Sequence, residues 1–221
     1  MRSDPGGPLV TFYDDASGER VELSAVTFDN WVAKTANLLV DGLGLAAGDT
    51  AAVVLPMHWQ ALVVVAGCWS AGLTVALGMP QGAAVAFTAE GWPPVPAAET
   101  IVLSLRPMGA PLAAPQNGTV DYAAEIRAYG DRFGGPRPGA HDAAVGSETH
   151  AELCTAAAVT GSGRVLLAPT CDPPLDRATV LAAYLTPLLT GGSSVICRHA
   201  DPDLLTRRAT TERATRLEEP G

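Results

Sequence analysis

The sequence predicts an α/β fold in which one or more largely parallel sheets are flanked by helices. Residues 51–55 form an unbroken apolar run, which is typical of a strand that is covered on both faces. A long apolar segment and a second apolar run at 73–77 follow it. Strand, helix and strand in that order make a parallel crossover unit. Short apolar runs alternate with helical patterns along the rest of the chain, which favours the same fold class.

The limits of this crossover unit are marked by turn residues. Gly48 and Asp49 form a turn pair before the first strand, and Pro56 ends that strand. Residues 57–71 are apolar on every side, so a helix here must be buried. Gly72 can end this helix because glycine adopts the left-handed conformation without strain.

The first 42 residues predict a hairpin and a helix. The β-prone runs 9–13 and 20–23 flank an Asp/Gly turn. Thr27 is the expected N-cap of the helix, with Asp29 in its first turn. Its buried face is expected to carry Phe28, Trp31, Thr35, Leu38, Leu39 and Gly42.

Similar reasoning places the elements that follow residue 80. Strands are expected at 85–89, 101–105, 165–168 and 194–198. Helices are expected after Asp121, at 147–158 with Ser147 as N-cap, at 177–189 before Gly191, and at 203–217 after Asp201 and Pro202. In the last helix, Glu212 is expected to pair with Arg208 and Arg216 at i,i+4 spacing.

Composition limits the classes of function. The chain has 221 residues, 48% of them hydrophobic, which predicts a globular protein. Its net charge of −9 argues against nucleic acid and against an anionic membrane surface. No run is long enough to cross a membrane, and the first residues do not resemble a signal peptide, so a cytoplasmic protein is expected. The four cysteines lack zinc-site or disulfide spacing and are expected to be buried thiols: Cys68, Cys154, Cys171 and Cys197.

Residues 131–146 are irregular and rich in glycine and proline. They are the best candidate for a linker. We therefore expect a single domain over 1–221, with 1–130 and 147–221 as its candidate subdomains.

Residues 48–56, with the apolar helix and Ala71-Gly72 after them, resemble the amino-terminal region of the adenylate-forming enzymes. This superfamily includes acyl-CoA synthetases, luciferases and peptide-synthetase adenylation domains. Residues 30–39 look like the first helix of the family. The similarity is clear over 24–78 and weak over most of the chain, and it also extends to short actinobacterial proteins. It implies the fold of the family's first subdomains.

The family's phosphate-binding loop has a counterpart in this sequence only at its two flanks. Residues 149–153 resemble the start of the helix that follows the loop, and 142–145 resemble the strand before it. Between them the family has a longer Gly/Ser/Thr-rich loop with a lysine, whereas this chain has only Gly146, Ser147 and Glu148. The Glu148 carboxylate would stand where a phosphate lies. The family's positions for magnesium, ribose and a catalytic lysine fall after Leu217 and have no counterpart here.

The resemblance therefore implies no ATP cofactor, no metal site and no catalytic residue. The remaining candidates for ligand binding are Ser147, Thr149 and His150, at the rim of the shortened loop, and Asp172. Asp172 follows a strand end, where open α/β sheets bind ligands. A helix-terminus histidine and a loop cap are the simpler interpretations of His150 and Asp172. The cluster at 161–164 has the helix-to-strand order of an ordinary turn, which is the wrong order for a phosphate loop.

Three functions are consistent with these observations. The first is a non-catalytic remnant of an adenylate-forming enzyme that acts through a protein partner or self-association. The second is an ATP-independent binder or enzyme that uses the residual acyl pocket. The third is one subunit of a split acyl-CoA ligase, which the shortened loop disfavours. A homodimer is expected because the helix at 57–71 needs cover on every side. Nucleic acid and membrane insertion are not expected.

Overall fold

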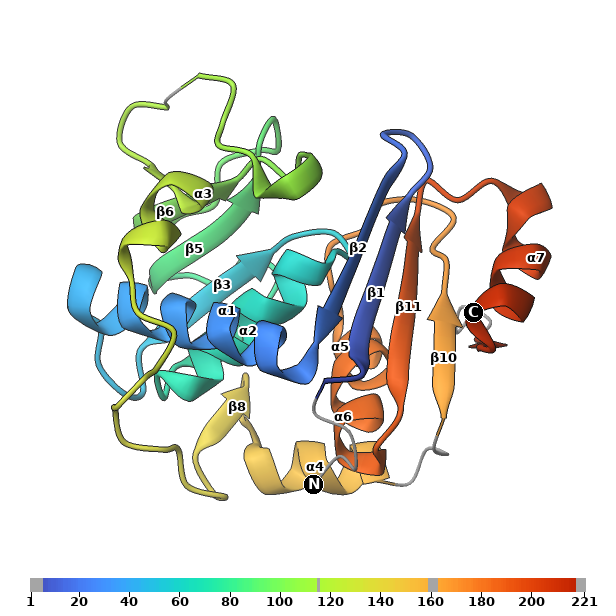
Figure 1. The fold of residues 1–221 in the computed structure, drawn as a ribbon. Helices are drawn as coiled ribbons and strands as arrows, with labels where there is room; N and C mark the ends of the chain where they lie inside the picture. Colours follow the sequence, from blue (N-terminus) through green and yellow to red (C-terminus); the bar gives the residue numbers. More distant parts are fainter. Residues whose placement is uncertain (1–5, 115, 159–162, 218–221) are drawn as a thin grey trace.

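The computed structural model describes residues 6–114, 116–158 and 163–217. Within them the chain forms two sheets, with α1 (Ala25–Asn37) and α2 (Trp59–Ser70) packed between them (Figure 1). This confirms the predicted α/β class with largely parallel sheets. Residues 161 and 162 of the predicted helix-to-strand turn lie outside the described residues.

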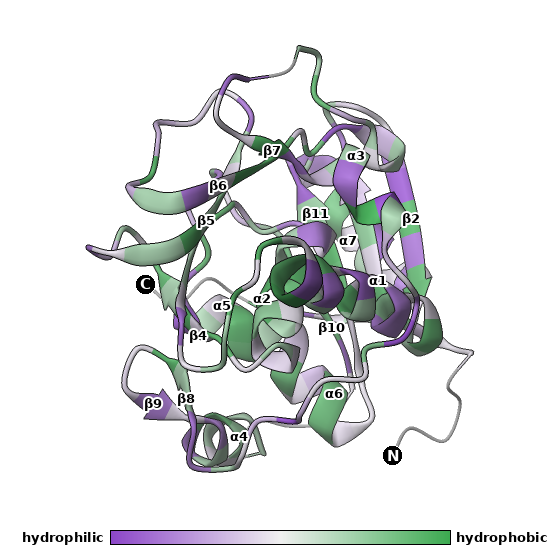
Figure 2. Ribbon diagram, turned by 90° about the vertical axis from the view of Figure 1, so that its left-hand side faces the viewer, coloured by the Kyte–Doolittle hydropathy of each residue, from purple (hydrophilic) through white to green (hydrophobic). Residues whose placement is uncertain are grey.

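The five-stranded sheet joins the two ends of the described chain. Its order is β12-β10-β11-β1-β2, and every neighbouring pair is parallel except the β1–β2 hairpin, which the sequence predicts. In register, Thr11 of β1 lies beside Val195 of β11. The strands are β12 (Thr215–Arg216), β10 (Arg164–Leu167), β11 (Ser193–Arg198), β1 (Pro8–Asp14) and β2 (Glu19–Ser24). β2 is an edge strand, and its alternating hydrophilic and hydrophobic bands are visible in Figure 2.

The seven-stranded sheet has the order β7-β6-β5-β3-β4-β8-β9. Its neighbouring strands are parallel except β8 and β9, which form a hairpin. The strands are β3 (Thr50–Val54), β4 (Thr74–Leu77), β5 (Ala83–Ala89), β6 (Ala97–Leu103), β7 (Val120–Asp121), β8 (Ala143–Val145) and β9 (Glu148–Thr149). β3 is central and buried, as predicted. The two sheets do not correspond to the two predicted subdomains, 1–130 and 147–221, because β1 and β2 pair with the carboxy-terminal strands. The division into subdomains stays a proposal.

The crossover β3–α2–β4 is confirmed. Almost every residue of α2 is buried, and Gly72 ends it with φ 79°. α2 lies so close to α1 that a Cβ at Gly67 would stand 2.6 Å from the Thr35 side chain, so only glycine fits there. The chain's own sheets and helices therefore cover α2, and this helix no longer requires a dimer.

The start of α1 differs from the prediction. Ser24, not Thr27, is the N-cap, and its hydroxyl oxygen accepts a hydrogen bond from the Thr27 N–H, with N···O 3.1 Å. Asp29 therefore lies beyond the first turn. Two hydroxyl residues three positions apart both suit a cap, and the end of β2 at Ser24 decides between them.

The other helical segments lie near their predicted positions, but the helix predicted at 147–158 begins only at His150, after a short strand. α1 continues as a π-helical turn at Leu38–Gly42, and residues 177–190 form one continuous helix that includes a π-helical stretch. Gly191 ends this long helix with φ 75°. The remaining helices are α3 (Tyr122–Glu125), α4 (His150–Ala158), α5 (Arg177–Val180), α6 (Thr186–Thr190) and α7 (Pro202–Glu212), with the π-helical Leu181–Leu185 between α5 and α6.

The prediction for α7 is correct at its start and wrong at its end. Asp201 caps it, but the helix stops at Glu212 because Arg213 takes a left-handed conformation with φ 51°. Glu212 does not pair along the helix. Its carboxylate instead binds the Arg164 guanidinium of β10, with Nη2···Oε2 2.5 Å. The predicted ion pairs of Glu212 with Arg208 and Arg216 were wrong, because charged side chains of the sheet compete with those of the same helix for the Glu212 carboxylate.

The burial of cysteines is only partly as predicted. All four are free thiols; Cys68 and Cys197 are buried, but Cys154 and Cys171 are exposed. No helix in the described part of the chain is long and apolar enough to span a membrane.

Candidate functional site

The candidate site lies at the carboxyl edge of the five-stranded sheet. β11 lies between β10 and β1 and is parallel to both, so the carboxyl ends of the three strands lie at one edge of the sheet. Open α/β sheets bind ligands at such an edge. Four charged or titratable side chains gather there from positions far apart in the sequence, and we call them the strand-end cluster: Asp14, Asp172, Arg198 and His199.

His199 is the centre of the strand-end cluster. Its Nδ1 lies 2.8 Å from Asp14 Oδ1, and its Nε2 lies 3.0 Å from Asp172 Oδ2. Both hydrogen bonds form only when both ring nitrogens carry a proton, because carboxylate oxygens accept and do not donate. The His199 backbone has φ 47°, which is uncommon outside glycine and marks a residue held in place by its surroundings.

The carboxylates of the cluster are held ionised. Burial raises the pKa of Asp14, but hydrogen bonds from His199 and the Ala16 N–H outweigh it and lower the pKa below its ordinary value. Burial also raises the pKa of Asp172, and the Arg198 guanidinium outweighs it. Arg198 Nη2 lies 2.6 Å from Asp172 Oδ2. The two carboxylates are therefore engaged by neighbouring side chains and are not a free base or nucleophile.

His58 is a buried titratable residue electrostatically coupled to this cluster. It is 1% exposed and caps α2, where its Nδ1 accepts a hydrogen bond from the Gln60 N–H. Burial, and then the positive charge of Arg198, lower its pKa to about 3. The imidazole is therefore neutral with its proton on Nε2, which has no hydrogen-bond partner among the described residues.

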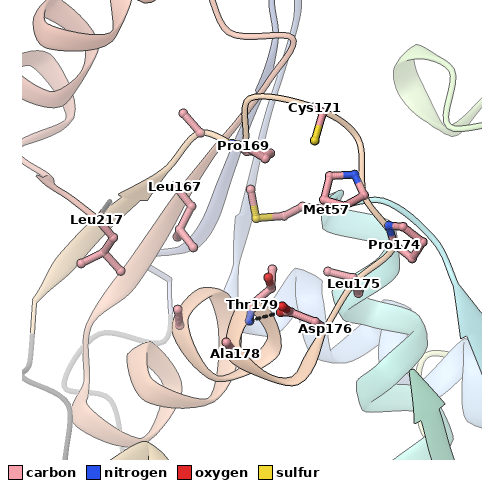
Figure 3. A pocket seen from close by; sticks show the side chains of 13 residues that line it. Met57, Leu167, Pro169, Cys171, Pro174, Leu175, Asp176, Ala178, Thr179 and Leu217 are labelled. Carbon is pink, nitrogen blue, oxygen red and sulfur yellow. Dashed lines mark hydrogen bonds between the residues drawn. The ribbon is translucent and has the colours of Figure 1, made fainter. Parts of the chain in front are cut away.

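A cavity of about 340 Å³ opens beside the cluster, and we call it the sheet-edge cavity. It lies between residues 167–176, the first turns of the helix at 177–190, and Met57. Figure 3 shows the Met57 side chain extending into the space between Pro169 and Thr179. Its walls are mostly apolar: Met57, Leu167, Pro169, Pro174, Leu175 and Ala182.

The loop that forms one wall of this cavity is fixed where it meets the helix at 177–190. The Leu175 N–H donates to the Leu55 carbonyl, with N···O 2.7 Å. Next to it, Pro174 and Pro56 form an isolated antiparallel β-bridge. The Asp176 carboxylate caps the helix by accepting from the Thr179 N–H, with N···O 2.7 Å. Because the Asp176 carboxylate already interacts with the positive end of the helix dipole, this end of the cavity suits a neutral group.

A second cavity of about 260 Å³ adjoins the first. It shares Ala168, Pro169 and Cys171 with it and is also lined by Asp172 and His199. The apolar space therefore leads towards the strand-end cluster. Such an arrangement can hold a short apolar chain with a polar end. Among the described residues, no group of three His, Cys, Asp or Glu side chains has the geometry of a metal site.

The structure separates the predicted site residues. Asp172 lines the second cavity, whereas His150 lies against Trp69, with ring centroids 5.9 Å apart, and lines a different cavity. Burial lowers the pKa of His150. Ser147 is exposed in the β8–β9 turn. Thr149, not Ser147, caps α4, since its Oγ1 accepts from the Glu152 N–H, with N···O 3.3 Å.

Asp14, Arg198, His199, Met57 and Cys171 were missed at the sequence level. The rule that singled out Asp172, a polar residue after a strand, applies equally to Asp14 and His199. That rule brings residues together only when the neighbouring strands are known. The pairing of β1 with β11 is a long-range contact that the sequence pattern does not contain.

The predicted resemblance to adenylate-forming enzymes is confirmed at the level of fold. The chain is similar to an acyl-CoA synthetase of Brucella canis, with 18% identity and TM-score 0.70 over 96% of this chain and 44% of that protein. It is also similar to acetoacetyl-CoA synthetase of Streptomyces lividans, with 18% identity and TM-score 0.71 over 95% of this chain and 39% of that protein. The chain thus spans less than half the length of these enzymes.

A closer relative is similar over nearly its whole length. No protein-family model matches the sequence. A "TIGR03089 family protein" of Mycobacterium tuberculosis is 37% identical over 230 residues, which cover 98% of this chain and 93% of the relative. Identity at this level over both chains shows common family membership. The chain therefore belongs to the TIGR03089 family, whose fold here is that of the amino-terminal part of acyl-CoA synthetases.

Proposed function

We propose that this protein is a non-catalytic relative of the adenylate-forming enzymes that binds an apolar or acyl ligand without ATP. The observation that carries the proposal is the β8–β9 hairpin. It occupies the place in the sequence where the resemblance implies a phosphate-binding loop. The ligand class is inferred from the sheet-edge cavity.

The hairpin is poorly suited to hold a triphosphate. Val145 pairs with Glu148, and only Gly146, with φ 56°, and Ser147 lie between them. Phosphate loops use several free N–H groups and a cation, and a tight two-residue turn cannot present them. The Glu148 carboxylate beside this turn would repel a phosphate.

The sheet-edge cavity supports an acyl or other short apolar ligand. It is lined mostly by apolar side chains and lies at the edge where open α/β sheets bind ligands. Similar structures include an anthranilate CoA ligase in complex with anthranoyl-AMP and a fatty acyl CoA synthetase. Those ligands belong to those proteins, and they favour an acyl class here.

Calorimetric titration tests both halves of the proposal. With ATP–Mg we expect no binding in the micromolar range, and no pyrophosphate exchange with any carboxylic acid. With medium-chain acyl-CoA or fatty acid we expect one-to-one binding that Ala182→Phe abolishes by filling the cavity. Ala124→Phe, at an exposed position on α3, is the matched control. A clear ATP isotherm would contradict the non-catalytic assignment, and acyl binding unaffected by Ala182→Phe would contradict the site.

A further inference from the structure

A third cavity, separate from the two at the sheet edge, has the chemistry of a binding site. It has a volume of about 640 Å³ and lies between α1, α2, the long helix at 177–190 and the loop of residues 131–138. We call it the helix-side cavity. Its floor and walls include Trp69, Tyr184, Phe133, Arg132 and Arg137. It shares no lining residue with the sheet-edge cavity.

Two aromatic rings, Trp69 and Tyr184, form part of the floor of the helix-side cavity, and the buried Phe28 packs behind them. Phe28 stacks on Tyr184 with ring centroids 5.2 Å apart, and Tyr184 stacks on Trp69 at 6.4 Å. The Trp69 Nε1–H donates to the Ala144 carbonyl, with N···O 2.8 Å, which fixes the indole plane. His150 meets the same indole edge-on. The Trp69 and Tyr184 rings, fixed by these contacts, give the cavity an aromatic wall against which a planar ring can pack.

The opposite wall is a loop held at both ends. Asn37 Nδ2 donates to the carbonyls of Gly130 and Arg132, each with N···O 3.0 Å. At the other end, the Ala151 N–H donates to the Ala140 carbonyl, with N···O 2.8 Å. Between these clamps the Phe133 ring lies over Gly135, where a Cβ would stand 2.2 Å from the ring. Gly135 therefore lets Phe133 take its place in the cavity wall.

Two arginines on this loop have unused charge. Arg132 and Arg137 are exposed, and within the described residues no carboxylate forms an ion pair with either guanidinium. Two acids also line the cavity. Asp131 is already paired with Lys34, with Nζ···Oδ1 2.9 Å, which leaves Asp29 as the single uncompensated negative charge. The wall thus carries a net positive charge on a protein whose overall charge is −9.

We propose that the helix-side cavity binds a planar aromatic carboxylate. Its ring would lie against Trp69, Tyr184 and Phe133, and its carboxylate would bind the two free guanidinium groups, which match carboxylates in a planar, two-point geometry. Aromatic stacking and charge-assisted hydrogen bonds then act together, because one ligand uses both walls. The inference does not depend on the function proposed for the sheet-edge cavity.

Binding of naphthalene-2-carboxylate to the full chain tests this inference. We expect one-to-one binding in calorimetry, accompanied by a change in tryptophan fluorescence. Arg132→Gln with Arg137→Gln should weaken the affinity by about tenfold or more, since the loss of even one charged hydrogen bond contributes about that factor. Arg207→Gln, at an exposed position on α7, is the matched control and should leave the affinity unchanged. Unchanged melting temperatures would show that the variants are folded.

Three further measurements test whether binding depends on the carboxylate and on this cavity. Naphthalene-2-methanol, which lacks the charge, should bind at least about tenfold more weakly than the carboxylate. Inorganic phosphate should not displace the carboxylate, and Ala182→Phe in the sheet-edge cavity should not change its affinity. The proposal would be overturned if the carboxylate did not bind up to millimolar concentration, if the neutral alcohol bound equally well, or if phosphate displaced the carboxylate. It would also be overturned if Ala182→Phe changed the affinity, or if the variant without both arginines kept full affinity.

Discussion

Glu148 and Arg177 form a two-point ion pair that connects the β8–β9 hairpin to the start of α5. Arg177 Nε lies 2.6 Å from Glu148 Oε2, and Arg177 Nη2 binds the other carboxylate oxygen. The acid that stands in place of a phosphate loop is therefore engaged by the chain itself. It joins the hairpin to the helix that forms one side of the sheet-edge cavity.

The pH dependence of stability should report this pair. The hydrogen bond from Arg177 is the main cause that lowers the pKa of Glu148 below its ordinary 4.5. The pair therefore stabilises the fold above about pH 4.5, and that contribution is lost as the pH falls through the lowered pKa. Because both side chains are partly exposed, we expect about 1 kcal/mol or less. A double-mutant cycle of Glu148→Gln and Arg177→Gln in urea measures it; additive effects of the two changes at pH 7 would show that the pair contributes nothing.

His58 should remain neutral in the folded protein well below the pH at which an exposed histidine is protonated. Its folded-state pKa of about 3 lies below its ordinary 6.5. The unfolded chain therefore binds the proton first, and stability should fall progressively from about pH 6.5 towards pH 3. His58→Asn keeps a side chain that can cap α2 and should flatten this part of the stability curve. Histidine NMR provides a direct check; a His58 resonance that titrates near pH 6 contradicts the prediction.

The central position of β3 makes Val53→Asp severely destabilising. Val53 is 0% exposed, and an aspartate there would be a charge in the core without a partner. We expect a loss of several kcal/mol or failure to fold. Ser147→Asp places the same side chain in an exposed turn and should leave the melting temperature nearly unchanged. A soluble Val53→Asp protein that melts at the wild-type temperature would refute the assignment of β3.

The cap of α4 can be assigned by a pair of substitutions. Thr149→Ala removes the side chain that accepts from the Glu152 N–H and should cost about 1 kcal/mol. Ser147→Ala should have little effect because Ser147 lies in the hairpin turn. Urea unfolding of the two variants measures the difference. The reverse order of effects would restore Ser147 as the cap.

Self-association remains a proposal that the fold does not require, since α2 is covered within the chain. The large apolar side chains that stay exposed are dispersed along the chain: Val26, Met79, Met108, Leu189 and Leu204. A dimer would have to bury some of them. Light scattering at micromolar concentration measures the mass directly. A value near the 22.7 kDa of one chain excludes the dimer, and twice that mass supports it.

The sequence was most informative where a single local pattern determines the structure. The crossover β3–α2–β4 follows from apolar runs between turn residues, and Gly72, Asp121 and Asp201 act as predicted at helix ends. Helix caps were less certain where two hydroxyl residues competed. Ser24 and Thr149 were chosen by the strands that end beside them, which propensity alone does not reveal.

The candidate site was hardest to predict because its parts meet only through sheet pairing. Asp172 was identified from its position after β10, but its partners Arg198 and His199 lie 26 and 27 residues away along the chain, and Asp14 joins the cluster through His199 from 185 residues away. Glu212 was similarly assigned to neighbours on its own helix, whereas it binds Arg164 on β10. Long-range partners of charged side chains depend on topology, and a local pattern cannot rank them.

The parallel pairing of β1 with β11 has a consequence for synthesis of the chain on the ribosome. The β1–β2 hairpin is made before its partner strand β11, which ends at Arg198, so this sheet cannot close until the residues between them have been translated. Strands β3 to β6 are close in sequence and can assemble earlier. During this interval β1 has an unpaired edge, which is a template for wrong pairing with other chains. We expect the nascent protein to depend on chaperone protection of the β1–β2 hairpin until β11 is made.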